Sequence, residues 1–252
     1  MNTFTLENRL IIVTGASSGL GRQCAIDCSR MGARVILIAR NEERLAQTLS
    51  SMEGEGHAVY PFDLIEISGI KNMIKNIVTE HGKIDGLLHA AGISSVTPLK
   101  LITTEMYEQF FTTNVSSSIE LVKEITRMGN YTKGTCSLVL YASIMGVVGE
   151  KGKTLYSATK GALVAAVRSM ACELAPKGVR VNCISPGAIL TPINASQPYM
   201  ADPEKRKALE DKHPLGLGKP EDISSTCIFL LSDASRWITG QNIIVDGGYT
   251  AQ

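Results

Sequence analysis

Two kinds of segment alternate along the chain. Short apolar runs rich in β-branched residues are expected to be strands, at residues 9–14, 34–39, 58–61, 86–89, 137–141, 179–184 and 242–245. Longer stretches in which apolar residues recur at helical spacing are expected to be helices, at residues 21–31, 42–52, 67–81, 104–127, 154–174 and 220–231. Strands that are apolar throughout and alternate with helices predict a parallel sheet whose two faces are both covered.

Seven such strands, joined by crossovers of one hand, predict an α/β fold with a doubly wound, Rossmann-type sheet. The chain shows no internal repeat, low-complexity tract or Gly/Ser linker, so residues 1–252 are expected to form a single domain. One segment differs in composition: residues 190–219 are charged and interrupted by Pro198, Pro203 and Pro214. We interpret this segment as a lid over the substrate.

Composition and charge exclude several classes of function. The chain has 252 residues, a net charge of +1, 44% hydrophobic and 19% charged residues, which is typical of a globular protein. The near-zero charge argues against binding to nucleic acid or to a membrane surface, since both require a basic excess. The sequence lacks both a signal-peptide pattern and an apolar stretch of about 18 residues, so a cytoplasmic protein is expected.

The six cysteines contain no C-x-x-C pair, which favours buried free thiols in a reducing compartment. Cys24 and Cys28 are four residues apart and can share a helix face, but no histidine ligand lies near them. A metal site is therefore not expected.

The first strand ends in a glycine-rich turn, T-G-A-S-S-G-L-G, that opens the first helix. Glycines at this junction let the backbone approach a pyrophosphate closely, and the helix N-terminus offers free N–H groups and the positive end of its dipole. The position of the turn therefore predicts a dinucleotide site. Its residues are Gly15, Ser17, Ser18, Gly19, Leu20 and Gly21.

The end of the second strand indicates which dinucleotide is preferred. An acidic residue there would accept hydrogen bonds from the adenosine ribose and repel a 2′-phosphate. This chain has Ala39 instead, followed by Arg40 and Asn41. Because an arginine can bind a phosphate in bidentate fashion, we expect NADP(H) to be preferred, with NAD(H) possible.

A phenol and an ammonium are predicted to share one helix face. Tyr156 and Lys160 are four residues apart at the start of the predicted helix 154–174. Tyrosine, with an ordinary pKa near 10, becomes a useful acid–base group when a neighbouring ammonium stabilises its phenolate. Ser143 follows the strand 137–141 at the sheet edge where ligands bind, and its hydroxyl can polarise a substrate carbonyl.

These motifs resemble the short-chain dehydrogenase/reductase family from residue 10 to residue 248, and the chain looks closest to the 3-oxoacyl-[acyl-carrier-protein] reductases. The turn resembles the family's T-G-x-x-x-G-x-G signature. Ser143, Tyr156 and Lys160 are similar in order and spacing to its catalytic Ser, Tyr and Lys. Asn114 resembles its fourth catalytic residue, which holds a water that joins the lysine to bulk solvent.

The resemblance implies further contacts with the cofactor. Asp63 and Leu64 match the family's adenine-contacting pair, and Ala90, Ala91 and Gly92 lie where the backbone contacts the nicotinamide ribose. Pro186 and Gly187 form a turn against the nicotinamide, and Ile189 and Thr191 hold its carboxamide. Many members read Asn-Asn-Ala-Gly where this chain has His89-Ala90-Ala91-Gly92, and we interpret His89 as structural.

The leading hypothesis is an NADP(H)-dependent reductase of a 3-oxoacyl thioester, with the acyl group carried on acyl carrier protein. A dehydrogenase of a sugar, sterol or other secondary alcohol is the alternative, and a catalytically idle nucleotide-binding scaffold is a distant one. The apolar residues Ile144, Met145, Ile193, Pro198, Tyr199 and Met200 are expected to line the substrate pocket. Lys133, Lys151, Lys153 and Lys177 are candidates for docking the acidic carrier. The resemblance also implies a homotetramer or homodimer.

Overall fold

The computed structural model describes residues 3–191 and 201–252, in which seven parallel strands form one sheet of order β3-β2-β1-β4-β5-β6-β7. The strands are β1 (Leu10–Thr14), β2 (Arg34–Ala39), β3 (Ala58–Pro61), β4 (Gly86–His89), β5 (Ser137–Tyr141), β6 (Arg180–Pro186) and β7 (Asn242–Val245). The strand order reverses direction between β1 and β4, which is the switch point of a doubly wound sheet. The predicted fold class is confirmed.

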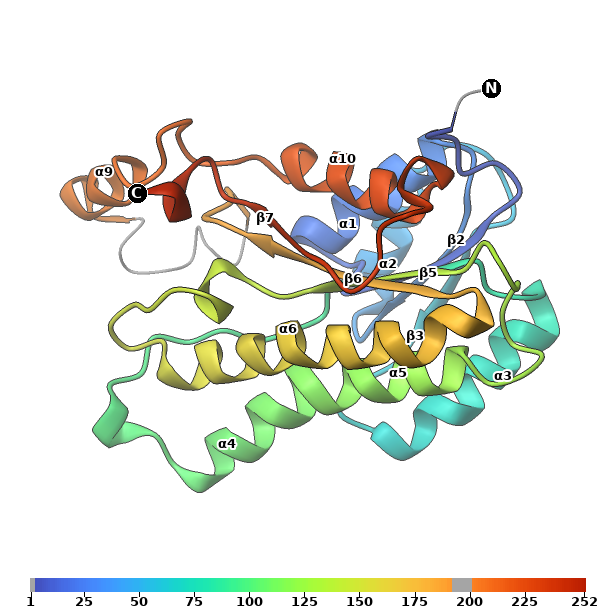
Figure 1. Cartoon of the computed structure of the whole chain (residues 1–252), viewed down its shortest axis with the longest axis horizontal. Coiled ribbons are helices and arrows are strands. Elements are labelled where there is room, and N and C mark those ends of the chain that lie inside the picture. The colour runs from blue at the N-terminus through green and yellow to red at the C-terminus, as the bar shows by residue number, and fades with distance from the viewer. Residues whose placement is uncertain (1–2, 192–200) are drawn as a thin grey trace.

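Helices cover both faces of the sheet (Figure 1). One face carries α1 (Gly19–Arg30), α2 (Glu42–Leu49) and α10 (Pro220–Leu231). The other face carries α3 (Ile70–His81), α4 (Thr104–Phe111), α5 (Ser117–Ile125) and α6 (Thr154–Leu174). A further helix, α9 (Pro203–Glu210), lies in the segment interpreted as a lid.

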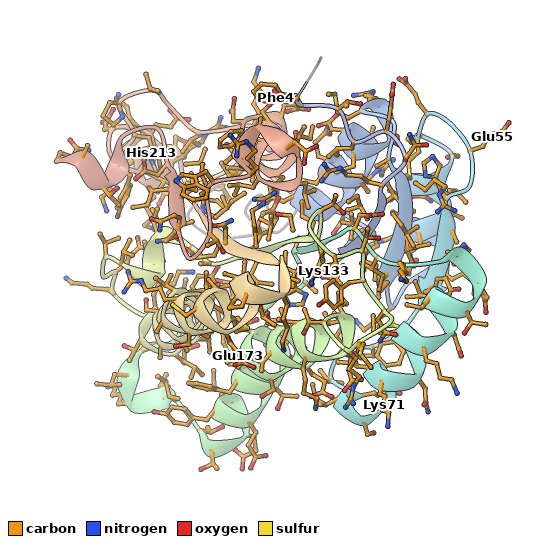
Figure 2. All side chains as sticks on the ribbon, turned by 45° about the vertical axis from the view of Figure 1, so that its right-hand side comes forward. Phe4, Glu55, Lys71, Lys133, Glu173 and His213 are labelled. Carbon is orange, nitrogen blue, oxygen red and sulfur yellow. The ribbon has the colours of Figure 1, made fainter. Side chains whose placement is uncertain are left out.

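An apolar core lies against each face of the sheet. This explains why polar and apolar residues do not alternate along the strands. In β2, Ile36 and Ile38 pack into the core beneath α3, α5 and α6, whereas Val35 and Leu37 pack into the core beneath α1 and α10. All four side chains are fully buried, because successive residues of a strand point to opposite faces. Charged side chains such as Glu55, Lys71 and Glu173 point away from these cores into solvent (Figure 2).

The predicted helix 104–127 is interrupted. A π-helical turn, Thr112–Ser116, separates α4 from α5, which ends at Ile125. The spacing of apolar residues predicted one continuous helix and did not indicate this turn, which is only five residues long. The predicted helix 42–52 ends early, at Leu49, and a 3₁₀ turn at Ile67–Gly69 precedes α3.

The described part of the lid segment contains an ordered helix. Asp202 caps α9 by accepting hydrogen bonds from the N–H groups of Glu204 and Lys205 at 3.1 and 3.3 Å. Pro203 occupies the first helical turn, where its missing N–H has no cost. The expected pocket residues Ile193, Pro198, Tyr199 and Met200 lie outside the described residues.

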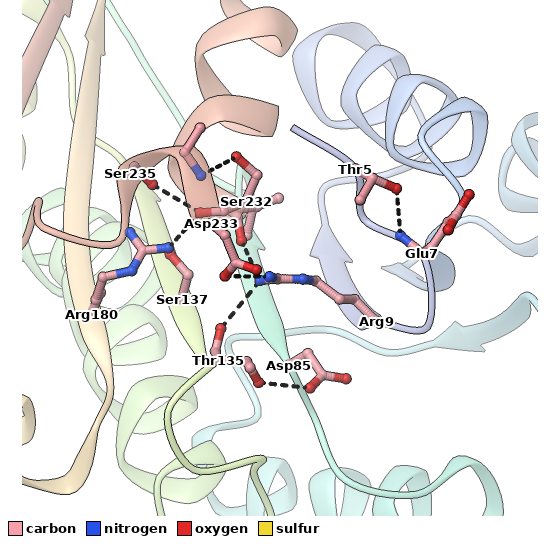
Figure 3. Close-up of polar contacts among 12 residues, drawn as sticks. Thr5, Glu7, Arg9, Asp85, Thr135, Ser137, Arg180, Ser232, Asp233 and Ser235 are labelled. Carbon is pink, nitrogen blue, oxygen red and sulfur yellow. Dashed lines mark hydrogen bonds and ion pairs between the residues drawn. The ribbon is translucent and has the colours of Figure 1, made fainter. Parts of the chain in front are cut away.

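A buried arginine, Arg9, and a partly buried one, Arg180, hold the C-terminal end of α10 against the sheet (Figure 3). Arg9 donates to the carbonyl of Leu231 at 2.8 Å and pairs with Asp233 at 2.7 Å. Arg180 donates to the carbonyls of Leu230 and Ser232 at 2.8 and 3.1 Å. Cations at this helix end satisfy carbonyls that have no intrahelical partner and complement the helix dipole.

All six cysteines are free thiols, and five of them are buried as expected. Cys172, on α6, is exposed, which differs from the expectation. Within residues 3–191 and 201–252, none of the helices has the length and apolar character that crossing a membrane requires.

Candidate active site

A cavity of about 760 Å³ opens at the carboxyl ends of the strands, and it contains both halves of the predicted site. Every residue predicted from the sequence to bind the cofactor lines this cavity. Ser143, Tyr156 and Lys160 line it as well, whereas Asn114 does not. Segments far apart in the sequence therefore meet where open parallel sheets bind ligands.

The backbone of the glycine-rich turn packs so closely that a side chain at Gly15 or Gly21 would overlap neighbouring atoms. Gly15 has φ +65°, and a Cβ there would lie 2.9 Å from the backbone nitrogen of Ala91. A Cβ on Gly21 would overlap the carbonyl oxygen of Gly15. The backbone at the start of α1 is therefore exposed to the cavity, and this cradle fits a dinucleotide phosphate.

Two arginines lie at the adenosine end of the cavity, where the sequence predicted Arg40 alone. Arg40 has a largely exposed side chain, and its Nη1 lies 3.8 Å from the Asp63 carboxylate. Asn41 caps α2 by accepting a hydrogen bond from the N–H of Arg44 at 2.8 Å. Arg44, in the first turn of α2, lines the same cavity. Sequence reasoning missed Arg44, although the sequence places this second arginine only four positions after Arg40.

Tyr156 and Lys160 lie on one face of α6, as predicted. The Nζ of Lys160 is 5.7 Å from the centroid of the Tyr156 ring and donates to the backbone carbonyl of Tyr141 at 2.7 Å. Lys160 is only 5% exposed, and its burial lowers its pKa to about 8. A positive charge at this distance stabilises the phenolate that forms when Tyr156 releases its proton.

Ser143 is brought to the same cavity by a close backbone contact between the turn that follows it and α6. It caps the 3₁₀ turn Ile144–Gly146 by accepting a hydrogen bond from the N–H of Met145 at 3.2 Å. A Cβ on Gly146 would lie 2.9 Å from the backbone carbon of Lys160, so only glycine lets the turn pack so closely on α6. This contact packs the turn that begins at Ser143 against the part of α6 that carries Tyr156 and Lys160.

Asn114 supports the site from behind the cavity wall. It lies in the π-helical turn and is 1% exposed. Its Oδ1 accepts from the N–H of Ile93 at 2.8 Å, and its Nδ2 donates to the Ile93 carbonyl and to Thr159 Oγ1, both at 3.0 Å. The amide thus joins the loop after β4 to α6 next to Lys160. In this structure its side chain positions the backbone around the site.

His89 is buried at the end of β4. Its Nδ1 lies 2.8 Å from Thr14 Oγ1, which also accepts from the N–H of Ala91 at 3.2 Å. Burial and the nearby Lys160 charge lower the pKa of His89 to about 3, so the ring is neutral. A neutral ring that joins β4 to β1 agrees with a structural role.

The lid is tied to the predicted nicotinamide turn by a histidine that sequence reasoning did not identify. His213 accepts a hydrogen bond from the N–H of Ala188 through Nε2 at 3.1 Å. Its Nδ1 bonds the carbonyl of Leu209 at 2.8 Å. This ring therefore fixes the turn after β6 relative to the end of α9.

Known proteins that are similar to this chain include dehydrogenases and reductases. Residues 15–250 match the profile of a protein family described as enoyl-(acyl carrier protein) reductase. The chain is 33% identical over 251 residues to L-rhamnose 1-dehydrogenase (NAD(P)(+)) of Azotobacter vinelandii, covering 96% of this chain and 97% of the relative. It is 31% identical over 247 residues to a 3-oxoacyl-[acyl-carrier-protein] reductase of Thermotoga maritima, covering 96% and 98%. A structure solved as a candidate short-chain alcohol dehydrogenase from Sinorhizobium meliloti has a TM-score of 0.94 at 29% identity and covers 99% of both chains.

The chain belongs to the short-chain dehydrogenase/reductase family. It is an oxidoreductase that depends on NAD(P) and acts on CH–OH groups. As a short-chain dehydrogenase/reductase it keeps the serine, tyrosine and lysine in one cavity, and it departs from the common Asn-Asn-Ala-Gly segment at His89 and Ala90.

The cavity walls of this short-chain dehydrogenase/reductase also contain polar residues that sequence reasoning did not select as site residues. These are Ser94, Gln109, Thr113, Glu150 and Lys153. Lys153 was expected on the surface as a docking residue, but it is only 8% exposed. Lys133, labelled in Figure 2, precedes β5, and Lys177 precedes β6. Both therefore lie at the amino ends of the strands, whereas the cavity opens at the carboxyl ends. Two of the four expected docking lysines are thus on the wrong side, and a third is buried.

Proposed function

We propose that the protein transfers a hydride between NADP(H) and a carbonyl or secondary alcohol of a small polar molecule. The observation that carries this proposal is the convergence of Ser143, Tyr156 and Lys160 on the cavity lined by the glycine-rich turn. When bound, the nicotinamide cofactor supplies or accepts the hydride. Every other task falls to residues of this chain.

The three side chains have distinct tasks. Ser143 donates a hydrogen bond from its hydroxyl to the substrate oxygen, keeps its own proton, and holds the reacting carbon in place. Tyr156 gives that oxygen a proton during reduction and removes it during oxidation. Lys160 stabilises the phenolate, and its bond to the Tyr141 carbonyl keeps its ammonium near the Tyr156 ring.

Preference for NADP(H) rests on charge at the adenosine end. Arg40 and Arg44 both line the cavity there, and Ala39 supplies no carboxylate that would repel a phosphate. The pair between Arg40 and Asp63 is long and exposed, so it can be exchanged for a phosphate at little cost.

Polar residues in the cavity walls favour a polar substrate. Ser94, Gln109, Thr113 and Lys153 line the cavity, and Lys153 lies beside the Tyr156 ring. A 3-oxoacyl thioester remains the other candidate, which the similarity to a 3-oxoacyl-[acyl-carrier-protein] reductase and the apolar Ile144 and Met145 support. The positions of Lys133, Lys153 and Lys177 weaken the case for a carrier protein docked at the cavity mouth.

A panel of carbonyl and alcohol compounds, assayed with NADPH, NADH and their oxidised forms, tests the proposal. It should include hydroxy acids, sugars, steroids and an acetoacetyl thioester presented both on acyl carrier protein and on a small thiol. We expect turnover of small polar compounds, faster with NADP(H). Efficient turnover of the protein-bound thioester alone would transfer the assignment to a 3-oxoacyl reductase, and turnover with NAD(H) alone would overturn the cofactor preference.

A further inference from the structure

A second lysine lies at the catalytic tyrosine. Lys153 is three residues before Tyr156, immediately before α6, and its Nζ is 5.6 Å from the centroid of the Tyr156 ring. This distance is close to the 5.7 Å between the same centroid and the Nζ of Lys160. Both lysines line the cavity, and Lys153 is only 8% exposed.

The ammonium of Lys153 has one polar partner among the described residues, the hydroxyl of Ser94, to which it donates at 3.2 Å. No carboxylate in the described part of the chain forms an ion pair with it; Glu150, three residues earlier, is exposed. Residues 192–200 contain no Asp or Glu. Glu150 lines the same cavity and acts on the ammonium electrostatically without forming an ion pair, so no carboxylate of the described residues is in direct contact with Lys153.

Burial of the charged Lys153 ammonium is unfavourable for the stability of the fold. Lysine side chains ordinarily extend to place their ammonium in water, whereas burial here lowers the pKa of Lys153. Lys153 also occupies the N-cap position of α6 without a capping side-chain hydrogen bond, and the helix dipole disfavours a cation there. A residue that costs stability in two ways and faces a cavity indicates a function in that cavity.

Ser94 adds the geometry that a ligand needs. Its hydroxyl accepts from Lys153 at 3.2 Å, so its own proton is directed elsewhere. Ser94 follows Ile93, whose backbone is held on both sides by Asn114. The ammonium and the hydroxyl are thus two donors held at fixed positions beside Tyr156.

We propose that Lys153 and Ser94 bind a carboxylate of the substrate while Tyr156 and Ser143 contact its reacting oxygen. The substrate class is then a hydroxy acid and the corresponding oxo acid, with the carboxylate a few bonds from the reacting carbon. This inference rests on the proposed function. Such a site also discriminates against neutral ketones. A bound neutral ketone would leave the Lys153 ammonium buried with no counter-charge in contact with it.

The test compares each of four oxo acids with its own methyl ester. The 2-oxo, 3-oxo, 4-oxo and 5-oxo acids place the carboxylate at increasing distances from the carbonyl, and all are assayed with NADPH. The wild type is compared with Lys153→Met, which removes the charge and keeps the length, and with Lys153→Arg, which keeps the charge. Lys75→Met makes the same change at an exposed position on α3 and serves as the matched control.

We expect the wild type to prefer at least one acid over its ester. In Lys153→Met the ratio of kcat/KM for that acid to kcat/KM for its ester should fall roughly 10–150-fold, mainly through KM, because a charge-assisted bond is lost. Lys153→Arg should retain most of the ratio, and Lys75→Met all of it. NADPH binding by each variant, followed by fluorescence, verifies that the site is folded.

Two results separate failure of the inference from failure of the proposed function. If esters and neutral ketones are reduced but no acid is preferred, or if Lys153→Met leaves the ratio unchanged, the carboxylate site is wrong and the oxidoreductase proposal stands. If no carbonyl or alcohol is turned over by a wild type that binds NADPH, the proposed function itself fails.

Discussion

Lys160 is held by the backbone of Tyr141, whose carbonyl accepts its Nζ proton at 2.7 Å. The phenol of Tyr141 points to the opposite face of the sheet, where it lies 2.9 and 3.0 Å from the thiols of Cys24 and Cys227. The side chain of Tyr141 therefore anchors β5 in one core, while its carbonyl positions the lysine in the site on the other side. The lysine depends on the rigidity of the strand and not on a carboxylate partner.

Replacing Tyr156 by Phe should remove the acid–base group and keep the ring. We expect kcat to fall by about 10²–10⁴-fold, the range that a positioned general acid supplies. NADPH binding, measured by fluorescence titration, should persist because the ring still fills its place. A variant that retains wild-type turnover on an authentic substrate would disprove the role given to Tyr156.

The depressed pKa of Lys160 predicts how stability changes with pH. In the folded protein burial lowers this pKa from 10.5 to about 8, so between these values the unfolded chain binds more protons than the folded one. The contribution of Lys160 to the free energy of unfolding therefore rises with pH through this window, by up to about 3 kcal/mol.

Urea unfolding of the cofactor-free protein measures this contribution. Lys160→Met has no titrating group, so its stability relative to wild type should be most favourable below pH 8 and should decline as pH approaches 10.5. Loss of the hydrogen bond to Tyr141 shifts the free energy of unfolding of this variant by a constant amount and does not change how that free energy varies with pH. Lys75→Met, at an exposed position, should show no such decline; an equal decline in both variants would mean that burial of Lys160 is not its cause.

Gly146 is predicted to be essential for positioning Ser143. In Gly146→Ala the new methyl would lie 2.9 Å from the backbone carbon of Lys160, so the 3₁₀ turn must move. Such overpacking costs about 1–3 kcal/mol, and we expect kcat to fall with it because Ser143 begins this turn. Gly149→Ala, where no atom lies within 4 Å of the added Cβ, is the control and should be close to wild type in both chemical denaturation and activity. Equal effects of the two substitutions would count against the packing argument.

Cofactor preference should depend on Arg40 and Arg44. Loss of one charge-assisted bond to the 2′-phosphate is worth about 1.5–3 kcal/mol, so Arg40→Met should reduce the affinity for NADPH relative to NADH by roughly 10–150-fold. Combining it with Arg44→Met should reduce the ratio further. Isothermal titration with both cofactors measures this ratio, with Arg236→Met, at an exposed arginine that follows the C-terminal end of α10, as control. If wild type bound NADH as tightly as NADPH, the assignment of Arg40 would be wrong.

The sequence by itself determined the elements and the order of the motifs. Strand and helix periods, the glycine-rich turn and the spacing of Tyr156 and Lys160 depend on contacts within a few residues, which local sequence records directly. The fold class and the cofactor end of the site followed from these, because parallel strands bring their carboxyl ends to one edge.

The tertiary structure alone decided what depends on packing between distant segments. It placed a π-helical turn at Asn114, brought Gly146 against Lys160, and buried Lys153 beside Tyr156. It also separated Lys133 and Lys177 from the cavity, although their sequence positions made them candidates for its mouth. A lysine in a loop reads the same in sequence whether it is solvated or enclosed, since its burial depends on how closely other segments pack around it.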